Sequence, residues 1–469
     1  MTNRSMHWFR QDLRLSDNPA LLEASKFDEV FPIYILDTFN NNKNIMGEAS
    51  SWWLFESLKA LNAQLNNKLS IFVGNPEDII KSFILKNKIN SVFWNRCYEP
   101  WQIERDIFLK KKLSEKKINV KTFNSSLLWE PWTIKKNDGK PYKVFTPFYK
   151  KGCLNAVSPR TPLDKPKNTN YIKDEKNTLR LDDLGLVSDK KWYNKLCDSW
   201  SPGELVAKEK LKKFISSNLF NYKIGRDFPS KEGTSLLSPH IHFGEISVNE
   251  IWHSIPVEEN SNFDHYRSEL GWREFSYSQL YYNNQLSTKN LQSKFDSFQW
   301  ENNEELKNAW KKGETGIPMV DAGMRQLWET GYMHNRLRMI VGSFLVKNLL
   351  VDWRFGANWF WNTLVDADLA SNSAGWQWVA GCGTDAAPYF RVFNPITQGI
   401  KFDQTGDYIR KYIPELKNLP NKFLFSPWEA PKEILSSSKV TLGSNYPFPI
   451  VDIKNSRLRA LESFKNLKN

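Results

Sequence analysis

One short segment of the sequence places an acid, an indole and a cation on a common helix face. Glu269, Trp272 and Arg273 stand at positions i, i+3 and i+4, which share one side of a helix. This combination is unusual for a face that packs in a core and would suit a face that binds a ligand. An arginine–acid pair around a buried tryptophan explains the same pattern. The residues alone leave both interpretations open.

A second face of this kind lies between Met333 and Met339. Asn335 and Met339 are four residues apart and meet on the same side of a helix, whereas Arg336 and Arg338 point elsewhere. A polar amide beside a flexible thioether could line a site. The alternative is that Met339 fills the core and the arginines are solvated.

The segment 366–378 has the least ordinary composition of the chain. Two acids, Asp366 and Asp368, are followed by Asn372 and then by Trp376 and Trp378. On a helix the two indoles lie about 200° apart, so one can be buried while the other lines a cavity. No His or Cys cluster accompanies the acids, so a metal site is not expected and pairing with an arginine such as Arg338 is favoured.

Residues 233–238 (Gly-Thr-Ser-Leu-Leu-Ser) place small hydroxyl side chains and backbone N–H groups in a turn before a helix. Such a turn can hold phosphate oxygens, although a helix N-cap is the ordinary explanation. Several common motifs are absent from the sequence: G-x-G-x-x-G, the P-loop, G-x-S-x-G and histidine pairs at i, i+4. A nicotinamide-dependent dehydrogenase, a P-loop NTPase and a zinc hydrolase are therefore disfavoured.

The elements that must position these residues fall into two kinds. In the first 125 residues, short apolar runs alternate with helical patterns, which predicts a parallel sheet flanked by helices. The expected strands are 6–10, 30–36, 69–73, 91–95 and 120–123, and the expected helices are 49–66, 76–87 and 100–117.

From about residue 201 the helical period dominates, with helices expected at 203–217, 263–283, 318–331, 334–349, 359–364 and 453–467. Between the two parts, six prolines punctuate residues 131–200, which we interpret as a connector over the surface. The predicted fold class is an α/β N-terminal Rossmann-like parallel sheet domain over 1–130, joined by this connector to an all-α domain over 201–469.

Charge and composition limit the partners. The 469-residue chain carries a formal charge of +13, with 11 Lys/Arg against 4 Asp/Glu between Lys81 and Lys121. This favours a polyanion such as nucleic acid. The four cysteines form no C-x-x-C pair, no secretory signal opens the chain, and no apolar stretch is long enough to span a bilayer. We expect a reduced, cytoplasmic protein without a membrane, nucleoid-associated if bacterial.

Taken together, these motifs resemble the photolyase/cryptochrome flavoprotein family, and within it the class I cyclobutane pyrimidine dimer photolyases. The resemblance runs from Trp8-Phe-Arg-Gln-Asp-Leu-Arg-Leu-Ser-Asp-Asn18 to Tyr446-Pro-Phe-Pro-Ile-Val451. Its most specific stretches are 271–275, 316–331, 333–339 and 376–399. It implies an antenna domain followed by a helical domain that binds FAD.

The resemblance also implies roles for individual residues. The residues implied to bind FAD are Tyr222, Thr234, Ser235, Leu236, Leu237, Ser238, Arg273, Arg338, Asp366, Asp368 and Asn372. Arg273 is expected on the phosphates, Arg338 and Asp366 as a buried ion pair, and Asn372 near flavin N5. Ala367 stands where some members of the family have Gly.

For the substrate, the resemblance implies a pocket for a flipped-out pyrimidine dimer. Glu269, Asn335, Met339 and Trp378 are implied to be catalytic, Trp272 to stack on the dimer, and Arg226 and Arg336 to hold the DNA backbone. Trp376, Trp353 and Trp300 match the family's chain of tryptophans from flavin to surface, and packing is the alternative role for these three.

The resemblance thus predicts a monomeric deoxyribodipyrimidine photo-lyase that acts on UV-damaged DNA. A blue-light receptor without repair activity is the alternative, which the absence of a histidine-rich segment at 335–339 and of a long extension after Pro449 disfavours. A second, antenna chromophore is expected near residues 98–106. Trp101 and Gln102 stand there where one folate-binding pattern has Asn-Glu. Folate, deazaflavin, a second flavin and an empty pocket remain open.

Overall fold

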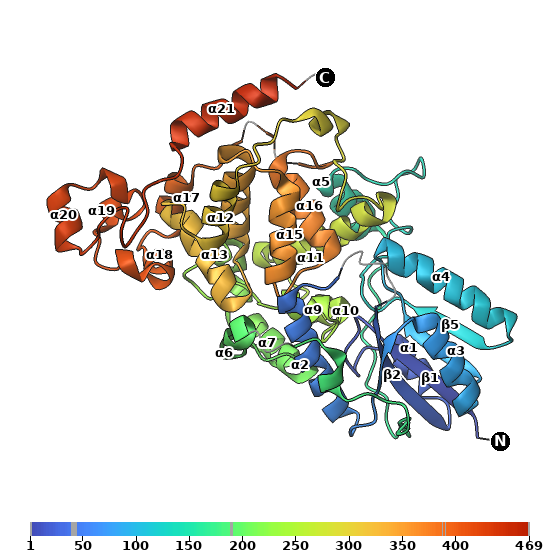
Figure 1. Ribbon diagram of the computed structural model, residues 1–469. Coiled ribbons are helices and arrows are strands. Elements are labelled where there is room, and N and C mark those ends of the chain that lie inside the picture. The colour runs from blue at the N-terminus through green and yellow to red at the C-terminus, as the bar shows by residue number, and fades with distance from the viewer. Residues whose placement is uncertain (1, 39–44, 188–190, 387, 390, 468–469) are drawn as a thin grey trace. The chain divides into compact units, whose positions relative to one another are not determined.

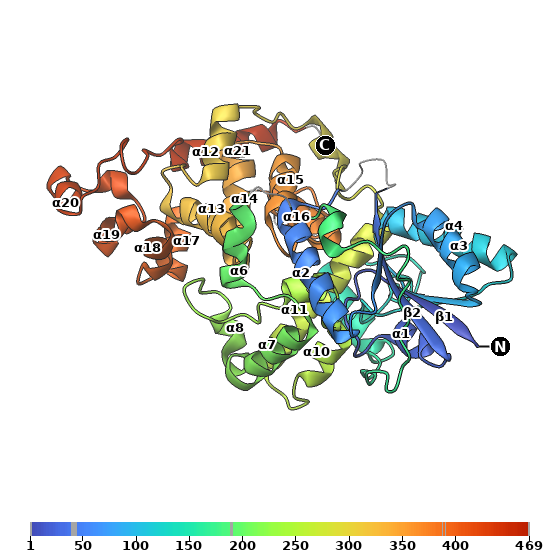
Figure 2. The same ribbon diagram turned by 60° about the horizontal axis from the view of Figure 1, so that its bottom comes forward.

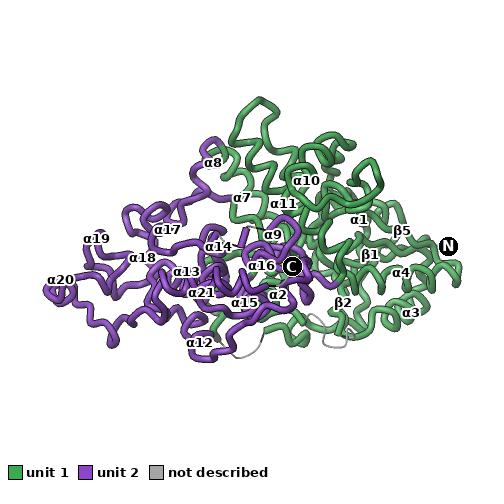
Figure 3. The backbone as a smooth tube through the Cα atoms, turned by 90° about the horizontal axis from the view of Figure 1, so that it is seen from above, with its two compact units in different colours: residues 1–219, 235–284, 365–368 green, residues 220–234, 285–364, 369–469 purple. Residues whose placement is uncertain are grey.

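The computed structural model describes residues 2–38, 45–187, 191–386, 388–389 and 391–467. The chain divides into two compact units, which Figure 3 colours separately. Unit 1 comprises residues 1–219, 235–284 and 365–368, and unit 2 comprises residues 220–234, 285–364 and 369–469. Unit 1 thus combines the expected α/β segment with the connector and the first expected helices. The division at residues 130 and 200 stays a prediction.

In the described residues, unit 1 contains one parallel sheet of five strands in the order β3-β2-β1-β4-β5. Trp8 on β1 pairs with Ile33 on β2 and with Trp94 on β4. The predicted strands are confirmed to within two residues, because β-branched and aromatic residues dominate each run. The strands are β1 (Arg4–Phe9), β2 (Glu29–Asp37), β3 (Ser70–Gly74), β4 (Ser91–Asn95) and β5 (Asn119–Phe123).

Helices cover both faces of this sheet. The helices α3 (Pro76–Asn87) and α4 (Pro100–Glu115) lie side by side in Figures 1 and 2, and both pack on the face that carries Met6 and Trp8. On the other face, α1 (Pro19–Ala24) packs near Val30 and Phe93. α1 was not predicted, since six residues are too few to show a helical period. Its start is marked by Pro19 and by the Asn18 side chain, which accepts from the Leu21 backbone N–H.

In the described residues, the rest of unit 1 consists of helices, helical turns and irregular segments. The connector is less superficial than expected: Phe145, Phe148, Tyr149 and Cys153 are buried, because aromatic side chains stand between its prolines. The remaining helices of this unit are α2 (Glu48–Gln64), α5 (Phe145–Pro147), α6 (Leu196–Ser199), α7 (Glu204–Ser217), α9 (Ser238–His242), α10 (Val248–Ser254) and α11 (Ser261–Tyr282), with short turns at Phe148–Gly152, Cys153–Asn155, Leu181–Leu184 and Lys191–Lys195.

In the described residues of unit 2, the regular elements are helices and helical turns joined by irregular segments. Its helices are α8 (Tyr222–Gly225), α12 (Glu304–Lys312), α13 (Pro318–Thr330), α14 (Asn335–Ser343), α15 (Trp353–Thr363), α16 (Leu369–Ala380), α17 (Pro395–Phe402), α18 (Asp407–Tyr412), α19 (Asn421–Leu424), α20 (Lys432–Ser437) and α21 (Ile453–Lys465). Short turns lie at Ser293–Ser297, Pro414–Leu416 and Pro427–Glu429, and another at Leu219–Asn221 begins on the last residue of the first segment of unit 1.

Two predicted helices of unit 2 have different bounds. The helix expected at 359–364 begins at Trp353, because Asp352 accepts from the Arg354 backbone N–H and starts α15 six residues earlier. The helix expected at 334–349 ends as α14 at Ser343 and continues as a π-helical turn, Phe344–Asn348. Among the described residues, no helix is both long and apolar enough to cross a lipid bilayer.

Candidate functional site

Two carboxylates from the segment 365–368 meet polar side chains of unit 1. The Ser238 hydroxyl, at the start of α9, donates to Asp366 Oδ2 at 2.6 Å. The Tyr277 hydroxyl on α11 donates to Asp368 Oδ2, and His242 Nδ1 lies 3.5 Å from the same oxygen. Burial opposes ionisation of Asp368, but His242, Arg273 and Tyr277 outweigh it and hold its pKa well below the usual range. Asp368 is therefore a fixed, buried anion.

Arg273 is the cation beside this anion. Its Nη1 donates to the Ser126 backbone oxygen at 2.8 Å and to Glu274 Oε1 at 3.0 Å, and its guanidinium lies 4.7 Å from the Tyr277 ring centroid. Burial raises the pKa of Glu274 to about 7, although Arg273 and the backbone N–H groups of Trp129 and Leu128 favour its charged form. Arg273 and Asp368, both predicted to bind the cofactor, thus belong to one buried network.

The residues predicted for the substrate on α11, Glu269 and Trp272, precede Arg273 by four residues and by one. Glu269 is partly exposed and its Oε1 lies 3.8 Å from His265 Nε2. The Trp272 ring stacks on Phe145 with centroids 3.7 Å apart and an interplanar angle of 11°. One face of the indole is therefore covered, so the other face is the one that could meet a ligand.

The segment before α9 has an unusual backbone. Leu236 has a φ of 52°, in the left-handed region that non-glycine residues rarely adopt. In unit 2, a Cβ at Gly233 would lie 2.2 Å from the Gly225 carbonyl oxygen, so only glycine fits there. Tyr222 is buried, and the Arg226 guanidinium lies 5.5 Å from its ring centroid.

The start of α14 gathers arginines in unit 2. Asn335 is exposed and Met339 half-buried. Arg336 forms an ion pair with Asp227 and lies 4.2 Å from the Phe402 ring centroid, while Arg338 Nε donates to the Met333 backbone oxygen at 2.8 Å. The arginines are therefore held in place rather than freely solvated. Arg338 and Asp366 belong to different units, and their pairing stays a prediction.

His334 caps α14 in the middle of these cations. Its Nδ1 accepts from the Arg336 backbone N–H at 3.2 Å, which fixes a neutral ring with the proton on Nε2. Burial, followed by the charges of Arg226 and Arg336, lowers the pKa of His334 to about 4. The Nε2–H is buried without a partner among the described residues.

The tryptophans differ in exposure as the helical angle predicted. Trp376 on α16 is 3% exposed and packs on Phe360 with centroids 5.0 Å apart, whereas Trp378 is half-buried. Trp353 is fully buried and donates from Nε1 to Asn290 Oδ1 at 2.9 Å. Trp300 is partly exposed. Trp376 and Trp353 are therefore buried and Trp300 is partly exposed, while the conducting role of the three stays a prediction.

Two other predicted positions are also described. Asn372 Nδ2 donates to the Ala357 carbonyl oxygen at 3.0 Å. Near the expected antenna position, Trp101 Nε1 donates to Glu99 Oε2 at 2.8 Å, and the Arg105 guanidinium lies between the Trp8 and Trp101 rings, 4.8 and 5.1 Å from their centroids. Trp8 is buried and Trp101 is partly exposed, and the four alternatives for the antenna stay open.

Sequence reasoning missed several residues of these networks. Tyr277 stands four residues after Arg273, so the helical spacing could have found it. Asp227 and His242 gave no such signal, because their partners lie 109 and 126 positions away in the sequence.

The comparisons with known proteins place this arrangement in a family. Residues 5–167 match the model of DNA photolyase, and residues 266–466 match the FAD binding domain of DNA photolyase. A deoxyribodipyrimidine photo-lyase of Agrobacterium fabrum is 45% identical over 98% of this chain and 97% of its own length. Cryptochrome-1 of Arabidopsis thaliana is 35% identical over 99% of this chain and 70% of its own length.

Solved structures agree. A class III photolyase from Agrobacterium tumefaciens superimposes with a TM-score of 0.96 and 44% identity, covering 100% of this chain and 98% of that one. An archaeal photolyase from Sulfolobus tokodaii with two FAD molecules has a TM-score of 0.82 and 32% identity, covering 99% and 100%. A parallel α/β sheet with a helical FAD-binding domain defines a class of flavoproteins. The chain belongs to the photolyase/cryptochrome family.

The residues present fit FAD. The hydroxyl groups and backbone N–H groups of 234–238 and the Arg273 guanidinium suit phosphate oxygens, and the Asp366, Asp368 and Asn372 side chains suit the polar edge of a ring. The buried, fixed charge of Asp368 and the left-handed backbone at Leu236 are features that a solvated surface would not need. The motifs suggested class I, and the similar solved structure from Agrobacterium tumefaciens is a class III photolyase.

Proposed function

We propose that this protein is a light-dependent DNA repair enzyme, a deoxyribodipyrimidine photo-lyase that splits cyclobutane pyrimidine dimers. The observation that carries the proposal is that Trp378, a large indole on α16, is only half-buried. Its helix packs against α14, which begins with Asn335 and carries Met339. An indole with a free face is suited to stack on an unpaired pyrimidine. FAD, when bound, supplies the photoexcited electron donor.

The chain's own residues bind and orient the damaged strand. A dimer inside a duplex is inaccessible, so it is flipped out, and the weak pairing of a damaged base lowers the cost of doing so. Trp378 and the open face of Trp272 contact the dimer, while Glu269 and Asn335 accept and donate hydrogen bonds at the pyrimidine edges. Arg226 and Arg336 hold phosphates without reading the sequence.

The test is repair of an oligonucleotide that carries one thymine dimer, with reduced FAD-loaded protein, in blue light and in darkness. We expect two thymines to be restored in light only. Trp378→Ala should lower repair and dimer affinity at least tenfold, because it removes the stacking wall. The matched control is Trp328→Ala, which removes an exposed indole of unit 2 that stacks on Trp359 and should leave repair unchanged.

The Glu269→Ala variant tests the residue assignments independently, since it removes a hydrogen-bonding carboxylate on α11 without changing the stacking surfaces. Repair at the wild-type rate by both Trp378→Ala and Glu269→Ala would contradict the residue assignments. Absence of repair by a flavin-loaded, fully reduced wild-type protein would contradict the function itself.

A second candidate is a blue-light receptor, which the similarity to cryptochromes supports. Such a protein would bind FAD and change its binding to a partner in light without restoring thymines. The repair assay separates the two functions directly.

A further inference from the structure

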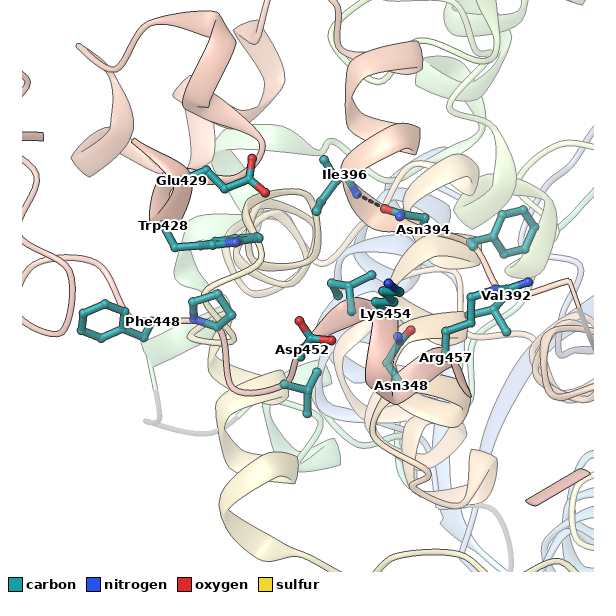
Figure 4. Close-up of a pocket in the computed structure, with 14 residues that line it drawn as sticks. Asn348, Val392, Asn394, Ile396, Trp428, Glu429, Phe448, Asp452, Lys454 and Arg457 are labelled. Atoms are coloured by element: carbon teal, nitrogen blue, oxygen red, sulfur yellow. Dashed lines mark hydrogen bonds between the residues drawn. The ribbon is translucent and has the colours of Figure 1, made fainter. Parts of the chain in front are cut away.

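A pocket in unit 2 lies outside every residue assigned above. Its volume is about 570 Å³, within the range of small-molecule sites. Its walls come from the end of the π-helical turn 344–348, the start of α17, the turn 427–429 and the first turn of α21. Figure 4 shows Trp428 and Phe448 on one side and Asn348, Lys454 and Arg457 on the other.

One side of the pocket is aromatic. Trp428 is partly exposed, and Phe448 is 59% exposed, which is unusual for a phenylalanine. Val451, Ile396 and Phe393 extend the apolar lining. Such a wall is suited to the face of a planar ring.

The opposite side is cationic. Lys454 and Arg457 stand at i and i+3 near the start of the thirteen-residue helix α21. In the described residues, neither side chain has a carboxylate within 4.0 Å, and both are exposed. Two uncommitted cations at a helix N-terminus attract an anion, above all a phosphate.

On the cationic side of the pocket also lies an acceptor with no donor. Asn348 is fully buried, and its Oδ1 has no hydrogen-bond partner among the described residues. Its Nδ2 donates to Ser456 Oγ at 2.8 Å, and that hydroxyl in turn donates to the Ile453 carbonyl oxygen at 3.2 Å. Because the hydroxyl proton is already used, it can only accept from Asn348, which fixes the amide with Oδ1 as the orphaned atom. A buried acceptor without a donor is costly, and a ligand N–H would satisfy it.

Two carboxylates complete the lining. Asp452 caps α21 through Oδ1, which accepts from the Asn455 backbone N–H at 2.7 Å, and Glu429 Oε2 accepts from Ser426 Oγ at 2.9 Å. Each carboxylate has a second oxygen that can accept from a sugar hydroxyl.

We propose that this pocket binds a nucleoside phosphate whose base carries an exocyclic amine. The base stacks on Trp428, its amine donates to Asn348 Oδ1, the sugar hydroxyls donate to Asp452 and Glu429, and the phosphate lies between Lys454 and Arg457. The ligand comes either as a free nucleotide or as one nucleotide of a single strand. The inference does not depend on the repair activity proposed above.

The experiment is calorimetric titration of the FAD-loaded protein with AMP, IMP, adenosine and inorganic phosphate. We expect AMP to bind. IMP, which lacks the exocyclic amine, should bind with an affinity lower by roughly fivefold or more, and adenosine, which lacks the phosphate, with an affinity roughly tenfold lower. The affinity for AMP should fall roughly tenfold or more in the Lys454→Ala/Arg457→Ala double variant, and by a similar factor in Trp428→Ala. Lys465→Ala is the matched control, since it removes an exposed cation from the last turn of the same helix.

A parallel titration with a tetramer of adenylate, a short RNA strand whose nucleotides keep their 2′-hydroxyl groups, identifies the source of the nucleotide. Loss of AMP binding but not of tetramer binding in the double variant assigns the site to a free nucleotide, and equal loss of both assigns it to a strand. No AMP binding by the wild-type protein, equal affinity for AMP and IMP, or AMP binding unchanged in the double variant would overturn the proposal. Repair of a dimer by all these variants should equal that of the wild-type protein, so failure here leaves the proposed function untouched.

Discussion

At the scale of the residue, His334 shows how a helix cap sets a charge state. Its Nδ1 must stay unprotonated to accept from the Arg336 N–H, and Arg226 and Arg336 repel a second proton. Because the His334 ring is neutral, it adds no further positive charge to those of the neighbouring arginines. If Arg226 and Arg336 hold phosphates, the neutral ring still offers a donor, Nε2–H, beside them.

His334→Asn tests this assignment. The folded pKa of about 4 lies below the ordinary value of 6.5, so between these pH values the unfolded chain binds a proton that the folded chain does not. The wild-type protein therefore loses stability as pH falls from 6.5 towards 4, by at most about 3 kcal/mol from this residue. Asparagine keeps a capping acceptor and does not titrate. Urea unfolding at several pH values should show the variant gaining on the wild type as pH falls, and parallel curves would contradict the assignment.

Local spacing predicted some residue environments and missed others. The 200° between Trp376 and Trp378 gave their different exposures, because helix geometry is set by the chain itself. The Arg336–Asp227 pair depends on segments 109 residues apart and left no local trace. The same is true of Asn348 and Ser456, which are 108 residues apart.

At the scale of the element, α15 and α16 depend on a glycine for their close packing. A Cβ at Gly356 would lie 2.1 Å from the Trp376 ring and 2.7 Å from Leu345. The Trp376 ring on α16 therefore packs directly against the glycine backbone of α15. The sequence predicted neither the start of α15 nor this contact. The start is set by a side-chain cap at Asp352, and the contact is tertiary.

Gly356→Ala should therefore lower the free energy of unfolding by about 1–3 kcal/mol, because Trp376 has to move. The matched control is Gly375→Ala on α16, where a Cβ meets nothing within 4 Å and the better helix propensity of alanine should raise stability by up to about 1 kcal/mol. Chemical denaturation of both variants measures the contrast. Equal effects would show that the Trp376 contact is not tight.

Strands were predicted better than helices. The central strands β1, β2 and β4 are mostly buried, and their apolar runs are bounded by polar turns, so sequence and environment agree there. Short helices such as α1 and the π-helical turn after Ser343 carry no period long enough to detect.

At the scale of the whole molecule, the formal charge of +13 should make DNA binding strongly salt-dependent. The logarithm of the affinity for undamaged duplex should fall linearly with the logarithm of salt concentration, with a slope of about −0.9 for each phosphate contacted. Fluorescence anisotropy at several salt concentrations measures this slope.

Arg336→Ala should reduce the size of that slope by about 1, since it removes one phosphate contact. Arg180→Ala removes the same charge from a side chain that is 80% exposed and pairs with Asp182, and it should leave the slope unchanged. Identical slopes for the two variants would remove Arg336 from the DNA-binding surface.

The division of the chain into two units has a consequence for folding during synthesis on the ribosome. Unit 1 takes its last four residues, 365–368, from beyond an eighty-residue stretch of unit 2. Ser238 and Tyr277 are synthesised long before Asp366 and Asp368, their hydrogen-bond partners, exist. A nascent chain arrested at residue 284 would therefore hold a formed sheet beside an unfinished polar network. Its α11 should stay sensitive to protease until translation has passed residue 368.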